Sequence, residues 1–233
     1  MENNKRFDMS IHYIMAICGG FFGVYAIVSR LNIFGSAQTA NLIGLVCDIV
    51  GKNLLEALLR VGALLIYISA IVLVTVLEKK TDWNLKYLAL SIEGITIILL
   101  GFFPEHMNPM IALYPMFFMT AFQWCVFKGA KGYACSTIFS TNNLKQTCSA
   151  LTEYIILDKE QEKERKEKMT KAKVFGGTVL SFHFGVMVGY LACQSFGIRS
   201  IWICLIPIVV VTVLLVFENE KGFKNNKLLS YIK

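Results

Sequence analysis

Long apolar stretches separated by short polar connections make up most of this chain. Eight stretches can be marked, at residues 11–28, 36–50, 61–77, 87–103, 109–127, 137–157, 174–193 and 201–217. A helix needs about 20 mainly apolar residues to cross a bilayer, and most of these stretches approach that length. The pattern predicts an all-α polytopic membrane bundle that forms a single transmembrane domain over residues 1–233.

Two stretches, the second and the sixth, contain many side chains that are costly in lipid. These side chains are Gln38, Thr39, Asn41 and Asp48 in the second stretch, and Thr141, Asn142, Asn143, Lys145, Gln146 and Glu153 in the sixth. Polar groups at membrane depth must find partners or line a cavity. We therefore expect two shorter polar half-helices, each entering and leaving the membrane on the same side, and six crossings by the other stretches.

The distribution of lysine and arginine supports six crossings over eight. With six, all but four of the 23 basic residues fall on one side, and those four are Arg30, Lys52, Arg60 and Arg199. Eight crossings would place Lys79, Lys80 and Lys86 outside, against the positive-inside tendency. The sequence thus predicts a multi-pass membrane protein with both termini cytoplasmic.

The order of the stretches repeats. Each half reads as span, half-helix, span, span, and "TANL" at Thr39–Leu42 matches "TNNL" at Thr141–Leu144 in three of four positions. Because each half crosses three times, the copies would face opposite ways, so we expect an inverted 3+3 repeat with halves at about residues 10–103 and 109–217. The charge run at residues 158–173 is expected to be a helical cytoplasmic extension, with a docking surface as the alternative.

Composition narrows the function classes. With 55% hydrophobic and 17% charged residues the chain is unlike a soluble domain, and its partner is a lipid bilayer. The net charge of +7 comes from residues between apolar stretches, so no nucleic-acid partner is expected. Seven scattered cysteines without a C-x-x-C pair predict no metal and no disulfide framework. No catalytic motif is present, so neither an enzyme nor a cofactor is predicted.

The starts of the half-helices carry the candidate chemistry. A helix that begins inside the membrane leaves its first backbone N–H groups unpaired, at the positive end of its dipole. If two such starts meet near the midplane, their hydroxyls and amides can bind a small solute or ion. The residues concerned are Gln38, Thr39, Asn41, Thr141 and Asn143. The alternative is that they only cap and lock broken helices.

Other polar residues in apolar stretches extend this candidate site. Glu93 near mid-span either couples protons to solute movement or is a neutral carboxyl bonded to a neighbouring helix. His183 is either the partner of Glu93 or a proton relay, or else a satisfied interhelical histidine. Gln123 adds a polar ligand on the fifth stretch. Arg30 follows the first stretch, where we favour an interface anchor over an anion ligand at the outer mouth.

Small residues predict close helix packing. Gly185 and Gly189 form a small-x-x-x-small pair, which suits contacts within the chain as well as a homo-oligomer.

Two segments resemble the YoaK family of bacterial six-span membrane proteins. "CGGFFGVYAIVSRLNIFGSAQTANLIGL" is similar to its opening, a double glycine, an aspartate-alanine pair and a threonine-glycine-asparagine, and "AFQWCVFKGAKGYACSTIFSTNNLKQT" looks like its second signature. In this resemblance, which covers essentially the whole chain, the motif positions are Gly19, Gly20, Thr39, Asn41, Gln123, Thr141 and Leu144. Gly23 stands where the family usually has aspartate, and Ala40 replaces the motif glycine. The family has no assigned biochemical activity, so the resemblance implies an architecture.

Taken together, these features predict a small-solute or ion transporter or channel that uses the paired half-helices. The alternative is a non-transporting membrane scaffold that binds a partner through its charged helix and small-residue faces.

Overall fold

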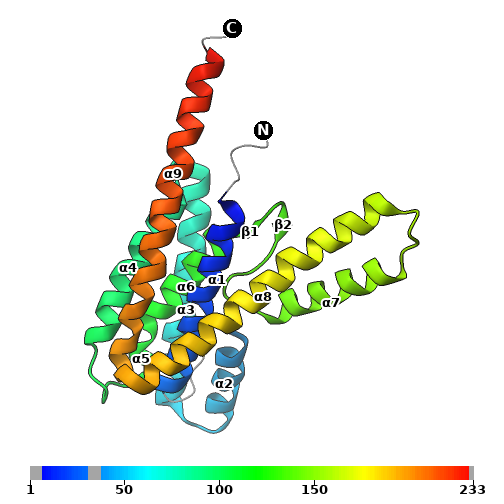
Figure 1. Ribbon diagram of the computed structural model, residues 1–233. Helices are drawn as coiled ribbons and strands as arrows, with labels where there is room; N and C mark the ends of the chain where they lie inside the picture. Colours follow the sequence, from blue (N-terminus) through cyan, green and yellow to red (C-terminus); the bar gives the residue numbers. More distant parts are fainter. Residues whose placement is uncertain (1–6, 31–37, 231–233) are drawn as a thin grey trace.

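The computed structural model describes residues 7–30 and 38–230 and is almost entirely helical (Figure 1). Its elements are α1 (Asp8–Ser29), α2 (Gln38–Val50), α3 (Leu54–Lys80), α4 (Leu85–Phe102), α5 (Pro109–Ala112), α6 (Tyr114–Val126), β1 (Gly129–Ala130), β2 (Tyr133–Ala134), α7 (Thr141–Ile156), α8 (Glu162–Phe196), the 3-10 helix η2 (Gly197–Cys204) and α9 (Leu205–Ser230). Each predicted stretch contains a helix, and the predicted all-α class is confirmed.

Several helices are long and apolar enough to cross a membrane. They are α1, α3, α4 and the segment Glu162–Asn219, in which α8, η2 and α9 follow one another. Large apolar side chains point outward from them: Leu65 on α3 and Val209 on α9 are each 60% exposed. An apolar outer surface of this kind is stable only against lipid or another apolar surface, so the chain has the character of a membrane protein.

The fifth and sixth stretches depart from simple helices. The fifth is divided at Leu113 into α5 and α6, because Pro115 has no N–H to continue the helical bonding. The sixth becomes helical only at Thr141; before it come the hairpin β1–β2 and an extended segment, residues 135–140. Lys131 and Gly132 turn the hairpin with φ of 51° and 83°, which a tight two-residue hairpin turn requires.

Helices α1 and α8 pack at backbone distance. A Cβ added to Gly20 would lie 1.9 Å from the carbonyl oxygen of Phe182, and one added to Gly185 would lie 2.0 Å from that of Ile17. Gly189 also faces α1, where its Cβ would meet the side chains of Val24 and Phe21. The small-residue pair therefore serves packing within the chain, and a homo-oligomer would have to use other faces.

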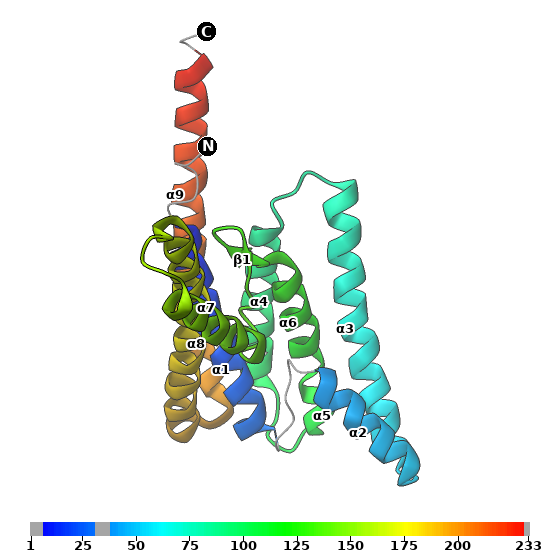
Figure 2. The same ribbon diagram turned by 90° about the vertical axis from the view of Figure 1, so that its right-hand side faces the viewer.

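The helix contacts fall into matching pairs. α1 packs on α8 as α6 packs on α3, α2 lies on α3 as α7 lies on α8, and α1 meets α9 as α6 meets α4. Figure 2 shows α1, α4 and α8 running downward and α6, α9 and α3 running upward. A side-chain contact repeats as well: Tyr13 on α1 donates to the carbonyl oxygen of Lys173 at 2.9 Å, and Tyr114 on α6 to that of Leu59 at 2.9 Å.

Polar contacts tie several helix ends together at the upper end of Figure 1. Asp8 at the start of α1 accepts a hydrogen bond from the backbone N–H of Lys131, and Lys128 pairs with Glu78 at 2.7 Å. The start of α1, the end of α3 and the hairpin therefore lie at one end of the bundle. Arg30 lies at the opposite end of α1.

α7 and α8 form an antiparallel hairpin that leans out of the bundle (Figure 1). The charge run enters α8 at Glu162 and continues without a break into the apolar half of that 35-residue helix. In the described part of the chain, the charge run forms an ion pair from Lys168 to Glu153 on α7, and not between two residues of the run. Arg165 also stacks on the ring of Tyr154, 4.3 Å from the centroid.

Candidate functional site

A buried polar network lies where α7 begins. Its side chains come from α1, α6, the extended segment, α7 and α8, and each is at most 2% exposed. They are His12, Gln123, Cys135, Thr137, Asn143 and Thr178. The start of the second half-helix is therefore the place where polar groups from five segments converge.

Asn143 fastens the extended segment to α7. Its Nδ2 donates to the carbonyl oxygens of Ser136, at 2.7 Å, and Phe139, at 3.0 Å. Its Oδ1 accepts from the backbone N–H of Ser136 at 3.3 Å and from Cys135 Sγ at 3.4 Å. The amide is fully used, so Asn143 holds the local backbone in place and has no free donor for a ligand.

His12 presents an open acceptor. Its Nε2 lies 3.1 Å from Thr178 Oγ1, and that hydroxyl donates its single hydrogen to the carbonyl oxygen of Val174 at 2.8 Å. His12 Nε2 must therefore be the donor, which leaves the lone pair of a neutral ring on Nδ1. In the part of the chain that the structure describes, this Nδ1 is buried without a hydrogen-bond partner.

Gln123 presents a second open acceptor. Its Nε2 donates to the carbonyl oxygen of Met15 at 3.2 Å and to Thr137 Oγ1 at 3.1 Å. The carbonyl can only accept, which fixes the amide orientation. Gln123 Oε1 is then buried without a partner among the described residues. Met15 lies one helical turn from His12, so both open acceptors adjoin the same part of α1.

The first half-helix has a different polar cluster. Asn41 Nδ2 donates to Gln38 Oε1 at 3.2 Å and to the carbonyl oxygen of Arg60 at 3.3 Å. Arg60 Nε pairs with Asp48 Oδ2 at 2.6 Å, and its Nη1 lies 3.5 Å from Asn41 Oδ1. Each asparagine is thus bonded within its own surroundings, Asn41 to Gln38 and Arg60 and Asn143 to the extended segment. No hydrogen bond joins the two among the described residues.

The remaining predicted residues are dispersed. Thr39 and Thr141, in the first turns of α2 and α7, are exposed. Glu93 is 1% exposed, and neither carboxyl oxygen has a hydrogen-bond partner within residues 7–30 and 38–219. His183 is exposed on α8, where its Nδ1 lies 2.8 Å from the carbonyl oxygen of Val179 in the same helix. Among the described residues there is therefore neither a Glu93–His183 pair nor an interhelical hydrogen bond by either residue.

Four members of the network, His12, Cys135, Thr137 and Thr178, escaped the sequence prediction. His12 had the best signal, because it interrupts an apolar stretch with a titratable side chain. The other three are small residues that are common in membrane helices, and their convergence is set by packing. Among the described residues, no three His, Cys, Asp or Glu side chains are placed to hold a metal ion.

Comparison with known proteins gives one match. A family model described as "Protein of unknown function (DUF1275)" matches residues 11–214. This is consistent with the resemblance to the YoaK family. No curated protein and no solved structure matches the chain.

Proposed function

The chain belongs to the DUF1275 family of proteins of unknown function, and we propose that it is a small-solute or ion transporter or channel of the bacterial cytoplasmic membrane. In this proposal the chain crosses the membrane six times as an inverted 3+3 repeat. The polar network at the start of α7 lies on the solute pathway.

The matched helix contacts support the repeat. When α1, α2, α3 and α4 are exchanged for α6, α7, α8 and α9, the contacts α1–α8, α2–α3 and α1–α9 become α6–α3, α7–α8 and α6–α4, all of which occur. The exchanged helices run in opposite directions (Figure 2). A two-fold axis in the membrane plane produces this relation, and many transporters are built on such an axis.

The placement of basic residues supports an orientation. Lys128 and Lys131 lie at the same end of the bundle as Glu78, which immediately precedes Lys79 and Lys80 on α3. Because cytoplasmic loops are enriched in Lys and Arg, this end is proposed to face the cytoplasm, with the start of α1 and the end of α9.

The observation that carries the pathway is the pair of open acceptors, His12 Nδ1 and Gln123 Oε1. A buried acceptor left unpaired costs roughly 1–3 kcal/mol, so such groups are commonly satisfied by water or a ligand. Both atoms accept hydrogen bonds, so the proposed solute carries N–H or O–H donors. Glu93 is the proposed proton carrier, since its buried carboxyl is also unpartnered in the described chain.

The test is flux into proteoliposomes, followed by stopped-flow light scattering with urea, glycerol, ammonium chloride and potassium chloride. We expect at least one of them to enter faster than into protein-free vesicles. His12→Phe keeps an aromatic ring, though a larger one, and removes both nitrogens, so it should lower that flux at least tenfold. His183→Phe is the matched control on the exposed face of α8 and should leave it unchanged.

Two outcomes would contradict this function: equal flux in the two histidine variants, or no flux above vesicles for any solute in the panel. Coupling is measured in the same vesicles under a pH gradient. Glu93→Gln is expected to keep passive flux and lose its response to the gradient, and an unchanged response would exclude Glu93 as the carrier.

The projecting α7–α8 hairpin supports the second candidate, a non-transporting scaffold. Its charge run is largely exposed and stands away from the bundle (Figure 1). In that case every solute in the panel fails to cross, while deletion of the hairpin tip abolishes assembly with a partner.

A further inference from the structure

A second polar site lies at the far end of α1 from His12. Arg30 ends this helix and its side chain is 1% exposed. Nη1 donates to the carbonyl oxygens of Pro104, at 3.0 Å, and Glu105, at 3.4 Å. Arg30 is therefore not the interface anchor that the sequence favoured, because an anchor keeps its charged head in the headgroup region.

One edge of this guanidinium is unused. Nε and Nη2 are buried and have no hydrogen-bond partner among the residues that the structure describes. These two nitrogens form the side-on edge of arginine, whose parallel N–H groups match the two oxygens of a carboxylate. Buried cations in membrane proteins usually pair with an anion, and within the described chain no acidic side chain forms an ion pair with Arg30.

Tyr25 adds a third group to this edge. Its ring is fully buried on the same helix, and its hydroxyl lies close enough to the Arg30 guanidinium to interact with it as a charge and as a hydrogen-bonding group. The pair does not reach full hydrogen-bond geometry, and in the described part of the chain the hydroxyl has no other partner. A ligand oxygen placed beside both groups would complete the bonding of each.

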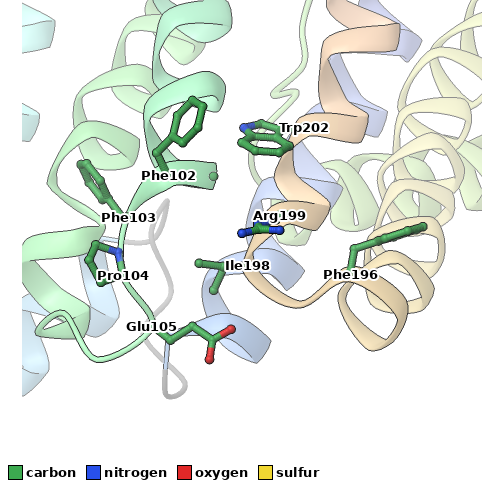
Figure 3. A pocket seen from close by; sticks show the side chains of 9 residues that line it. Phe102, Phe103, Pro104, Glu105, Phe196, Ile198, Arg199 and Trp202 are labelled. Atoms are coloured by element: carbon green, nitrogen blue, oxygen red, sulfur yellow. The ribbon is translucent and has the colours of Figure 1, made fainter.

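A pocket is lined by the same Pro104–Glu105 segment whose carbonyl oxygens Arg30 contacts, although Arg30 and Tyr25 do not line it themselves. It has a volume of about 460 Å³ and is lined by the end of α4, this segment and η2. Figure 3 shows Arg199 and Trp202 on the η2 side facing Phe102 and Pro104. Arg199 supplies an exposed positive charge there. Glu105 presents its carbonyl oxygen, not its carboxylate, to Arg30.

We propose that Arg30 and Tyr25 form a binding site for a small carboxylate anion, approached through the pocket at Arg199. The free edge of Arg30 holds both carboxylate oxygens and Tyr25 donates to one of them. The inference concerns binding alone and does not depend on transport through the His12–Gln123 network.

The test uses purified full-length protein in a neutral detergent, with thermal unfolding measured in potassium acetate and in potassium chloride at equal ionic strength. Acetate is expected to raise the midpoint above chloride, because it binds the folded state. Arg30→Lys keeps the charge but removes the side-on edge, and should weaken acetate binding at least tenfold. Tyr25→Phe should weaken it about fivefold, the factor for roughly 1 kcal/mol of hydrogen bonding.

Two controls separate the site from general charge effects. Tyr190→Phe, on an exposed face of α8, should leave acetate binding unchanged, and Arg199→Gln should weaken it only a few-fold. If Arg30→Lys does not fold, Tyr25→Phe decides alone. An acetate effect equal to that of chloride, or one unchanged in Tyr25→Phe, overturns the proposal.

A lipid headgroup is the other source of an oxyanion at this end of the bundle. Acetate titrations in nanodiscs of phosphatidylcholine, with and without phosphatidylglycerol, distinguish the two. We expect equal acetate affinity in both. Loss of acetate binding in the anionic nanodiscs would identify a lipid site and overturn the assignment to a soluble carboxylate.

Discussion

The two half-helices begin with nearly the same residues, yet their asparagines are held in different ways. In α7, Asn143 is fully buried and bonded to the backbone of the extended segment. In α2, Asn41 lies beside the ion pair of Arg60 and Asp48. Asn143 thus uses its whole amide on the extended backbone segment, whereas Asn41 bonds to Gln38, to the carbonyl oxygen of Arg60 and, at 3.5 Å, to the Arg60 guanidinium. The two half-helices therefore differ in the groups that hold their first turns.

The helices that follow the half-helices, α3 and α8, differ in how closely they approach their neighbours. α8 lies against α1 at backbone distance, through Gly20 and Gly185. α3 meets α6 through longer side chains, such as Tyr114 against Gly62, and much of its surface is exposed. The α1–α8 crossing is therefore packed more tightly than the α3–α6 crossing. Three quantitative expectations test this and the other differences between the two halves.

The largest effect is expected at the helix crossings. Gly185→Ala places a Cβ against the backbone of Ile17 and should lower the free energy of unfolding by about 3 kcal/mol. Gly62→Ala meets only the movable end of Tyr114, so about 1 kcal/mol is expected. Unfolding in micelles with increasing dodecyl sulfate measures both. Gly94→Ala is the control, since nothing lies within 4 Å of its Cβ. Equal losses at Gly185 and Gly62 would show that the two crossings are packed alike.

The asparagines come next. Asn143→Ala leaves backbone groups of Ser136 and Phe139 unpaired in a buried place, which should cost about 2–3 kcal/mol. Asn41→Ala loses longer bonds, and about 1 kcal/mol is expected. Asn142→Ala, exposed beside Asn143, serves as the matched control in the same unfolding assay. A greater loss at Asn41 than at Asn143 would reverse the comparison.

The smallest effect concerns two ion pairs, one between α2 and α3 and the other between α7 and α8. Hydrogen bonding to Lys168 lowers the pKa of Glu153 below its usual value, and the bond to Glu153 raises the pKa of Lys168. The pair therefore adds stability above the usual glutamate pKa, and this contribution is lost as the pH falls through the lowered value. It is lost again when the pH rises through the raised lysine pKa.

Glu153→Gln should flatten both limbs of the stability profile and change little at neutral pH, because exposed pairs are weak and screened by salt. Asp48→Asn should cost more than Glu153→Gln, since Arg60 and Asp48 are less exposed. Thermal midpoints of both variants at pH 4, 7 and 11 measure these effects. If Glu153→Gln lowered the midpoint at pH 7 as much as Asp48→Asn does, the expected order would be wrong.

The helices could be predicted from sequence because each corresponds to a continuous apolar stretch of the chain. The polar starts of α2 and α7 were visible in the same way. The hairpin before α7 was missed, although Gly129 and Gly132, both with positive φ, marked it. Only part of the site could be predicted. Gln123 and Asn143 stand out as amides in apolar surroundings, but Thr178 joins the polar network only because α8 packs on α1. No local pattern revealed that Arg30 is buried.

The unbroken course of α8 joins the charge run to the polar network through a single helix. Its 35 residues span roughly 52 Å at the rise of an α-helix, from the charge run past Thr178 in the wall of the network. Gly176 and Gly177 lie directly before Thr178, and glycines of this kind are where helices bend most easily. We therefore expect a change in the angle of the charged tip to be taken up at this glycine pair, next to the bond between Thr178 and His12.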